Sequence, residues 1–198
     1  MIQKKNNLIL ASGSPRRREL LSRLTDDFRI VIPNTDEHIL PNETPKDLVL
    51  RLSLKKALAV QKNYPDATIL SADTVVTYAG RILGKPRNSN EAFEFLKMLN
   101  NHTHEVFTGI CVLLQKNIKQ KCVQTQVTFG NFKESMLQNY AYSGEGLDKA
   151  GAYAIQGKGA FLVRSINGSA SSVIGLPLYE TSELLLSQGI GILNGERS

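Results

Sequence analysis

Apolar and polar positions along the chain form short blocks that predict strands and helices in alternation. Compact apolar or alternating runs indicate strands at Leu8–Ala11, Phe28–Ile32, Thr68–Tyr78, Ile82–Leu83, Glu105–Leu114, Lys121–Phe129 and Ala160–Ile166. Apolar residues at helical spacing indicate helices at Pro15–Leu24, Pro45–Gln61, Asn90–Leu99, Lys133–Ser143 and Pro177–Ser187. This mixture predicts an α/β fold on a mixed β-sheet, with polar loops at the strand ends lining a cleft.

Local signals support several of these boundaries. The spacing of a helix-capping pair occurs twice, at Thr44 with Asp47 and at Asn88 with Glu91. Gly189 follows the last helix as a stop signal. The two strands on either side of Lys116-Asn117 are expected to form a β-hairpin.

Length and composition are those of an ordinary soluble globular protein. The 198 residues are 41% hydrophobic and 21% charged, enough for one large domain or two small lobes. No apolar run reaches the roughly 18 residues of a transmembrane helix, and the polar start does not resemble a signal peptide, so we expect a cytoplasmic location. Cys111 and Cys122 could face each other across the hairpin, but buried free thiols in a reducing compartment are favoured.

The net charge of +6 indicates attraction to anions without saying which ones. Apart from Arg16–Arg18 the basic residues are scattered, with no long Lys/Arg tract and no basic stripe interleaved with aromatic residues. A compact anionic substrate explains this cluster better than a nucleic-acid duplex does. Neither stable nucleic-acid binding nor membrane association is expected, and the oligomeric state, monomer or homodimer, stays open.

The arginine cluster follows an apolar strand and a turn of small residues, Ser12-Gly13-Ser14. Ser14 is a suitable N-cap and Pro15 suits the first helical position, so free backbone N–H groups at the helix start would face an anion. Cations at a helix N-terminus are disfavoured by roughly 0.3–1 kcal/mol each, and a bound anion would reverse that effect.

Arg17 falls on the apolar side of this helix and should point toward whatever adjoins the helix start. The planar guanidinium group suits phosphate in particular. The alternative is a solvated basic first turn, in which Glu19 pairs with Arg16 or Arg23.

Asp73 is the strongest catalytic candidate because it lies in a strand that is apolar on both faces, Ile69–Val76. A carboxylate there must be paired, bind a metal or open onto a cleft, since burying it bare is costly. The alternative is a structural aspartate that accepts hydrogen bonds from loop amides.

Lys56 is unusual because it falls within the apolar face that Leu48, Leu52 and Ala59 form on the second helix. A lysine in such a place either extends to solvent or points at a bound anion, and the sequence leaves both open.

Three weaker candidates lie in loops. Lys85, in the tight turn Gly84–Pro86, could hold a phosphate, and Glu37 next to Asp36 could add a carboxylate for a divalent ion. Gln156 could read a base edge through its paired donor and acceptor. Their plain alternatives are a surface turn, solvated acids and a satisfied loop glutamine. No P-loop, nucleophile elbow or zinc-ligand spacing occurs in the sequence.

Many ordered blocks together resemble one family. They are Leu10–Arg17 with Glu19–Leu21, Asp36-Glu37, Lys56-Ala57, Ser71–Val76, Leu83–Pro86, His104 with Thr108-Gly109, Ser143–Glu145, Asp148–Gly151, Tyr153, Ile155–Gly157 and Gly175–Leu178. With these blocks the chain resembles the Maf family of nucleoside triphosphate pyrophosphatases from about Leu8 to Gln188.

The resemblance implies hydrolysis of the bond between the α- and β-phosphates of a nucleotide, with a divalent cation. It also implies an elongated mixed β-sheet flanked by helices, with two lobes and a cleft between them. Asp73 matches the position of the catalytic proton acceptor, and Arg16, Thr74 and Gln156 match positions linked to substrate choice. Their combination is similar to that of the branch acting on dTTP and UTP. The family is also linked to inhibition of septum formation.

Four places depart from the family's usual pattern. Asn100-Asn101 replaces a Ser/Thr-Gly turn, Gly146 a proline, Ala170 a tyrosine and Ser172 an asparagine. These differences bear on substrate preference and loop rigidity rather than on the reaction.

The main hypothesis is that residues 1–198 form a single pyrophosphatase domain. Ser12–Arg17, Lys56 and Lys85 would hold the triphosphate, and Glu37 and Asp73 would bind Mg²⁺ or Mn²⁺ with phosphate oxygens. Asp73 would orient or deprotonate the attacking water. The rivals are a nucleotide-binding regulator of cell division without turnover, and a nucleic-acid-binding protein.

Overall fold

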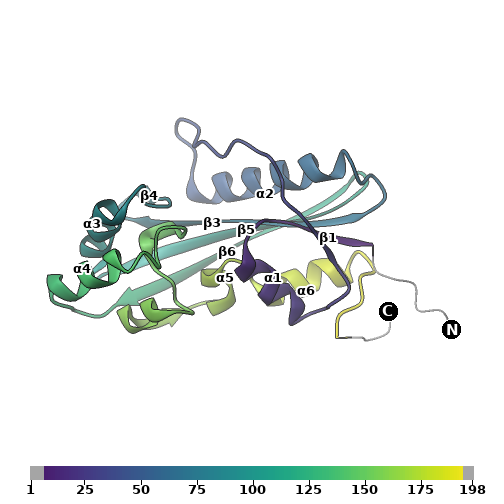
Figure 1. Ribbon diagram of the computed structural model, residues 1–198. Coiled ribbons are helices and arrows are strands. Elements are labelled where there is room, and N and C mark those ends of the chain that lie inside the picture. The colour runs from purple at the N-terminus through teal and green to yellow at the C-terminus, as the bar shows by residue number, and fades with distance from the viewer. Residues whose placement is uncertain (1–6, 194–198) are drawn as a thin grey trace. The chain divides into compact units, whose positions relative to one another are not determined.

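The computed structural model describes residues 7–193 and has an α/β fold, with helices flanking a mixed seven-stranded sheet (Figure 1). The strands are β1 (Leu8–Ala11), β2 (Arg29–Val31), β3 (Thr68–Tyr78), β4 (Arg81–Leu83), β5 (Thr103–Leu114), β6 (Asn117–Phe129) and β7 (Val163–Asn167). The helices are α1 (Pro15–Ser22), α2 (Pro45–Gln61), α3 (Ser89–Leu99), α4 (Glu134–Tyr142), α5 (Ala170–Ile174) and α6 (Leu178–Leu186), with two 3₁₀ helices, η1 (Ala150–Ala152) and η2 (Lys158–Leu162).

The sheet mixes parallel and antiparallel pairs. Its hydrogen-bonded order is β2-β1-β3-β5-β6-β7, and β4 pairs with β3 off this path. β1 runs parallel to β2 and β3, whereas β4 is antiparallel to β3 and β7 to β6. The prediction of an α/β fold on a mixed sheet is therefore confirmed.

The chain divides into two compact units. The first unit comprises the residues up to Asp73, residues 108–122 and the residues from Gly175 onward. The second unit comprises residues 74–107 and 123–174. The long strands β3, β5 and β6 contribute residues to both units, so a unit is not a continuous stretch of sequence.

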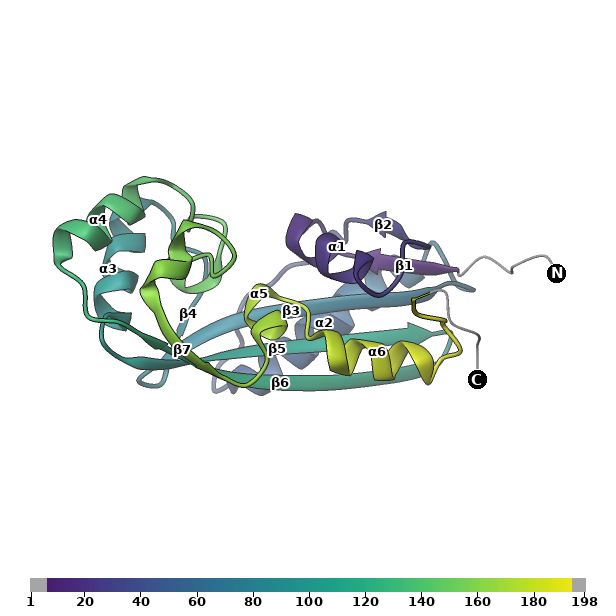
Figure 2. The ribbon, with the colours of Figure 1, turned by 90° about the horizontal axis from the view of Figure 1, so that it is seen from below.

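In the first unit, α2 covers one face of the strands, and α1 and α6 cover the other (Figures 1 and 2). All four residues of β1 are buried, as expected of a parallel strand with helices on both sides. Gly109 of β5 lies directly against α2, because a Cβ added to it would be 2.5 Å from the backbone oxygen of Val49. The Thr44 side chain caps α2 by accepting a 3.1 Å hydrogen bond from the backbone N–H of Asp47.

In the second unit, α3 and α4 pack side by side (Figure 2). Its core is apolar and includes Leu96, Leu99, Phe129 and Leu137. Asn100, one of the departures from the family pattern, joins the end of α3 to the segment before α4. Its amide donates to the backbone oxygen of Phe132 and accepts from the backbone N–H of Phe132, both at 3.0 Å.

The prediction of a strand at Ala160–Ile166 is wrong in its first half, because η2 ends at Leu162 and β7 begins at Val163. The carboxylate of Glu145 accepts hydrogen bonds from the backbone N–H groups of Lys158 and Gly159, which favours a helical turn there. The short helix α5 was not predicted, since five residues are too few to show a helical period. The other predicted elements occur, with ends that differ by up to four residues.

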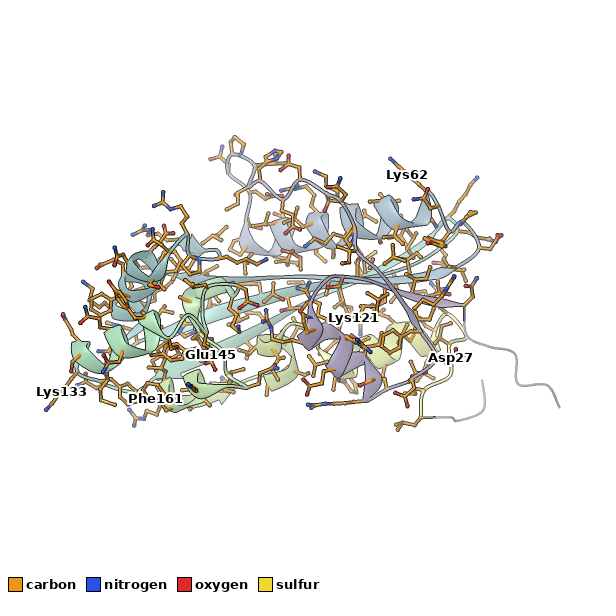
Figure 3. The ribbon with its side chains drawn as sticks, viewed as in Figure 1. Asp27, Lys62, Lys121, Lys133, Glu145 and Phe161 are labelled. Carbon is orange, nitrogen blue, oxygen red and sulfur yellow. The ribbon has the colours of Figure 1, made fainter. Side chains whose placement is uncertain are left out.

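Three findings bear on the bulk properties of the chain. Within residues 7–193, no helix is long and apolar enough to cross a bilayer. Cys111 and Cys122 are free thiols, the first buried and the second half-buried. Basic side chains such as Lys62 after α2 and Lys133 before α4 point outward singly (Figure 3).

Candidate active site

Asp73, Lys56 and Glu37 meet around the Lys56 ammonium group in the first unit. Asp73 of β3 is 5% exposed, and Lys56 reaches it from α2 with Nζ 2.6 Å from Oδ1. Glu37, from the loop between β2 and α2, places Oε1 3.1 Å from the same Nζ. The prediction that a buried Asp73 is not left bare is confirmed, and two carboxylates converge on one cation.

The surroundings of Asp73 favour its protonated form more than water does. Burial raises the pKa of the Asp73 carboxyl above its ordinary value, whereas Lys56 and Arg17 act to lower it. Glu37 adds to the rise because a second negative charge nearby disfavours ionisation. A carboxylate with a raised pKa is a stronger base than an exposed aspartate, which suits it to accept a proton from water.

Lys56 turns inward instead of extending to solvent. Its side chain is 8% exposed, and the carboxylates of Asp73 and Glu37 compensate its charge. The buried face of α2 also includes Val49, Ala57 and Val60, while Ala59 is only half-buried.

Arg17 lies on the packed side of α1, as its position in the helix predicts. Its Nε donates a 2.9 Å hydrogen bond to the backbone oxygen of Gly175, and its Nη1 lies 3.5 Å from the hydroxyl oxygen of Ser12. Burial lowers the pKa of the Arg17 guanidinium, and the negative charges of Asp73 and Glu37 oppose this effect. Arginine nevertheless stays charged at neutral pH, so Arg17 brings a fixed positive charge into the field of the two carboxylates.

The start of α1 has the expected cap. The Ser14 hydroxyl accepts from the backbone N–H of Arg17 at 3.4 Å, and the Ser12 hydroxyl accepts from the backbone N–H of Ser14 at 3.1 Å. Glu19 pairs with Arg23 at 2.9 Å on the exposed side of the helix, so this part of the alternative interpretation holds as well. Arg16 is half-buried, and Arg18 is exposed.

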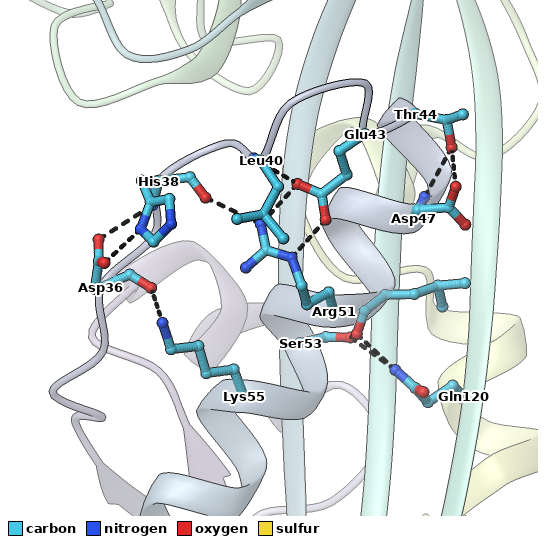
Figure 4. A network of polar contacts seen from close by, with 11 residues as sticks. Asp36, His38, Leu40, Glu43, Thr44, Asp47, Arg51, Ser53, Lys55 and Gln120 are labelled. Carbon is cyan, nitrogen blue, oxygen red and sulfur yellow. Dashed lines mark hydrogen bonds and ion pairs between the residues drawn. The ribbon is translucent and has the colours of Figure 1, made fainter.

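Two side chains of α2 hold the loop on either side of Glu37 (Figure 4). Lys55 Nζ donates to the backbone oxygen of Asp36 at 2.7 Å, and Arg51 Nη2 donates to the backbone oxygen of His38 at 3.0 Å. The carbonyl groups before and after Glu37 are thereby attached to the helix that carries Lys56. These hydrogen bonds fix the loop backbone on either side of Glu37. The Glu37 carboxylate is half exposed and extends from this backbone toward Lys56.

Arg51 is in turn held by Glu43 (Figure 4). Its Nε is 2.5 Å from Oε1 of Glu43 and its Nη2 is 2.7 Å from Oε2, a two-pronged ion pair. The hydrogen bonds from Arg51 lower the pKa of the Glu43 carboxyl, although partial burial opposes this. The sequence did not single out Arg51, Lys55 or Glu43, since charged residues in a loop or on the polar side of a helix carry no signal of what they bind.

Thr74, Lys85 and Gln156 belong to the second unit, and their roles stay predictions. Thr74 follows Asp73 on β3 and is half-buried, whereas Lys85 and Gln156 are exposed in turns. The turn of Lys85 is anchored within this unit, because the backbone N–H of Gly151 donates to the backbone oxygen of Gly84 at 3.2 Å.

Oxygen ligands for a divalent ion are few in the described part of the chain. Within residues 7–193, no three His, Cys, Asp or Glu side chains gather closely enough to hold a metal. Glu37 and Asp73, which share the Lys56 ammonium group, are the carboxylates that already converge on a positive charge. Such a pair suits an ion that takes its remaining ligands from phosphate and water, as Mg²⁺ commonly does.

Comparison with known proteins agrees with these features. A family model described as "Maf-like protein" matches residues 7–188. A protein of Bacillus cereus named dTTP/UTP pyrophosphatase is 47% identical over 171 residues, which cover 86% of this chain and 90% of that protein. A protein of the same name from Latilactobacillus sakei is 42% identical over 177 residues, covering 89% and 98%.

Among solved structures, the Staphylococcus aureus Ham1 protein is 14% identical, with a TM-score of 0.45 over 64% of this chain and 73% of that one, a similarity too low to support an argument. The match to the Maf-like family model, by contrast, spans residues of both units, and the relatives are aligned over most of their own length. The chain therefore belongs to the Maf family.

Proposed function

We propose that this protein hydrolyses dTTP and UTP to the nucleoside monophosphate and diphosphate. The relatives at 42–47% identity bear the name dTTP/UTP pyrophosphatase, which favours turnover over a purely regulatory role. The single observation that carries the proposal is the buried ion pair of Asp73 with Lys56, with Glu37 and Arg17 close by. A protein that only bound triphosphate would gain little from a buried carboxylate, because the carboxylate repels the phosphates.

In the proposed reaction a water molecule attacks the α-phosphorus. Asp73 accepts a proton from this water as the new oxygen–phosphorus bond forms. The bond between the α-phosphorus and the oxygen bridging to the β-phosphorus breaks, and diphosphate leaves with the bonding electron pair. Lys56 and Arg17 stabilise the negative charge that accumulates on the phosphoryl oxygens.

The remaining predicted residues bind the nucleotide in this proposal. Ser12, Arg16 and the positive end of the α1 dipole bind phosphate oxygens, and Lys85 adds a further cation. Arg16, Thr74 and Gln156 determine substrate choice, as the resemblance to the dTTP/UTP branch implies, and Gln156 reads the base edge. In this proposal the chain is a single domain of the family, whose match at residues 7–188 includes residues of both units.

A divalent cation, Mg²⁺ or Mn²⁺, is the proposed cofactor, with Glu37 and Asp73 as its protein ligands. When bound it would neutralise phosphate charge and polarise the phosphoryl group. The two carboxylates already share a cation, Lys56, which supports their use as a pair. We place the activity in the cytoplasm, where a reducing environment suits the free thiols of Cys111 and Cys122.

The proposal is tested by incubating the protein with dTTP, UTP, dCTP, dATP and dGTP and Mg²⁺, with and without inorganic pyrophosphatase. Phosphate that appears from dTTP and UTP only with the coupling enzyme supports diphosphate release. Equal phosphate without that enzyme indicates stepwise phosphatase action and contradicts the proposal. An absence of products with every nucleotide favours the regulator, and Asp73→Asn serves as the inactive control.

A further inference from the structure

Gln156 lies at the tip of a tight turn in the second unit. The backbone N–H of Gly157 donates to the backbone oxygen of Ala154 at 3.1 Å, which closes a four-residue turn with Gln156 at its third position. The Gln156 side chain is exposed. Where its carboxamide can reach therefore depends on how firmly the turn is held.

One tyrosine holds the beginning of this turn. The hydroxyl of Tyr140, on α4, accepts a 3.0 Å hydrogen bond from the backbone N–H of Ala154. The same hydroxyl donates to Oε2 of Glu145 at 2.8 Å. A single phenolic group thus links the first residue of the turn to a carboxylate.

That carboxylate holds the other end. Oε1 of Glu145 accepts from the backbone N–H of Lys158, and Oε2 accepts from the backbone N–H of Gly159, both at 2.9 Å. These N–H groups belong to the start of η2, immediately after the turn. Tyr140 and Glu145, called here the Tyr140–Glu145 pair, therefore fix the backbone two residues before and two residues after Gln156.

The packing around the Tyr140–Glu145 pair leaves little freedom. A Cβ on Gly157 would collide with the Glu145 carboxylate, and one on Gly159 would collide with the Tyr140 hydroxyl. Partial burial opposes ionisation of Glu145, but the hydrogen bonds from Lys158, Gly159 and Tyr140 outweigh it and lower the pKa of this carboxyl. Glu145 is thus an ionised acceptor and Tyr140 a neutral donor to it, and both are in direct contact with the backbone that they hold.

We propose that Tyr140 and Glu145 are positioning residues that set base selectivity by fixing the place of the Gln156 carboxamide. The inference rests on the proposed function, in which Gln156 reads the base. A carboxamide presents one donor and one acceptor side by side, which matches the N–H and C=O groups adjacent on the edge of uracil and thymine. A turn held at both ends keeps this group at one distance from the base, so a base with a different edge or size leaves polar groups unpaired.

Tyr140→Phe removes the hydroxyl and Glu145→Gln weakens the acceptor, without a large change of shape in either case. For each variant we expect kcat/KM for UTP to fall about tenfold or more. For the poorer substrates CTP and ATP, kcat/KM should change less than about threefold. The ratio of kcat/KM for UTP to that for CTP or ATP therefore becomes smaller. The matched control is Tyr142→Phe. It removes a tyrosine hydroxyl from the same helix, one that is bound to Asn90 instead of the turn, and it should leave selectivity unchanged.

A double-mutant cycle with Gln156→Ala separates positioning from a general loss of structure. If the Tyr140–Glu145 pair acts through Gln156, Tyr140→Phe should have little further effect on selectivity in the Gln156→Ala protein. Additive effects, or an equal loss of kcat/KM for every nucleotide together with a lower melting temperature, would overturn the inference.

Binding of UTP and CTP to Asp73→Asn, measured by calorimetry, gives the selectivity independently of turnover. If the Asp73→Asn protein binds UTP better than CTP, and adding Tyr140→Phe abolishes this preference, the inference is supported even if hydrolysis is not seen. Hydrolysis or binding that prefers UTP equally in wild type and variants refutes the inference but not the proposed function. A wild-type protein that neither hydrolyses nor binds nucleotides refutes both.

Discussion

Lys56 Nζ lies 2.6 Å from Asp73 Oδ1, and each of the two side chains is 8% exposed. The helix α2 supplies the cation and the strand β3 supplies the carboxylate, so the relationship depends on how these two elements pack. Removing Lys56 takes the ion-pair partner from the buried Asp73 carboxylate, and such a loss commonly costs about 3–5 kcal/mol of stability. Removing Asp73 leaves Lys56 paired with Glu37 alone, at 3.1 Å. The pair therefore links the proposed chemistry to the integrity of the fold around it.

Replacing Asp73 tests its proposed role as proton acceptor. Asp73→Asn keeps the size of the side chain but cannot take a proton from water, so kcat for UTP should fall by about 10²-fold or more. The exposed Asp66→Asn is the matched control and should retain normal turnover. Near-normal kcat in Asp73→Asn would show that another group accepts the proton.

The pH dependence of kcat/KM tests the surroundings of Asp73. Because burial raises the pKa of Asp73, the acid limb of the profile should lie at higher pH than an exposed aspartate would give. Lys56 acts to lower this pKa, so the residual activity of Lys56→Gln should show an acid limb moved further up in pH. Lys62→Gln, at the exposed end of α2, should leave the profile in place. An acid limb at the same pH as in wild type, or at lower pH, in Lys56→Gln would contradict this account.

Arg51 should affect metal binding without touching the metal. Arg51→Ala frees the carbonyl group after Glu37, so the Mg²⁺ concentration giving half-maximal rate should rise about tenfold or more, with kcat largely restored at saturation. Calorimetric titration of Mn²⁺ into the nucleotide-free protein should show the same weakening. Lys46→Ala, on the exposed first turn of α2, is the control. Unchanged metal affinity in Arg51→Ala would show that Glu37 needs no support from Arg51.

The Glu43–Arg51 pair should make stability depend on pH in a defined direction. The hydrogen bonds from Arg51 lower the pKa of Glu43 in the folded state. Glu43 therefore binds a proton more readily in the unfolded chain than in the folded one. The stabilisation is present above the ordinary glutamate pKa of about 4.3 and is lost as pH falls through the lower folded value. Urea unfolding should show a larger loss of stability between pH 7 and pH 3 in wild type than in Glu43→Gln. Equal losses in the two proteins would indicate that the Glu43–Arg51 pair contributes nothing to the pH dependence of stability.

Gly109 tests the close approach of β5 to α2. Gly109→Ala would bring a Cβ to 2.5 Å from the backbone oxygen of Val49, so the helix must shift and stability should fall by about 1–3 kcal/mol. Gly84→Ala is the matched control. Among residues 7–193, apart from Gly84 and its two chain neighbours, no heavy atom lies within 4 Å of its added Cβ, so stability should change little. A Gly109→Ala protein as stable as wild type would show that α2 can move away without cost.

Much of the fold could be predicted because its signals are local. Both capping pairs occur: Thr44 accepts from the Asp47 N–H, and Asn88 Oδ1 accepts from the Glu91 N–H at 3.0 Å. The bounds of β3 and α2 follow the apolar pattern at both ends. The start of η2 could not be predicted in the same way, since it depends on the carboxylate of Glu145 more than ten residues earlier in the chain.

The candidate site was predictable to the extent that its residues violate the pattern around them. Lys56 on a buried helix face and Asp73 in an apolar strand both stand out, and the structure brings them together. Arg51 and Lys55 do not stand out, because their partners are backbone carbonyl groups, which every residue possesses. The role of Thr74 remains a prediction from the resemblance, that of Lys85 a prediction from its tight turn, and that of Gln156 a prediction from both the resemblance and its carboxamide.

The hydrogen bonds between α2 and the loop before it have a consequence for chimaeras of this protein and its relatives. Arg51 and Lys55 hold the backbone oxygens of the residues on either side of Glu37, and the Glu37 carboxylate contacts Lys56. A crossover placed between the loop and the helix would join a loop from one parent to cationic side chains from another. Chimaeras should therefore keep residues 36–56 from a single parent, whereas exchanges outside that block leave this arrangement whole.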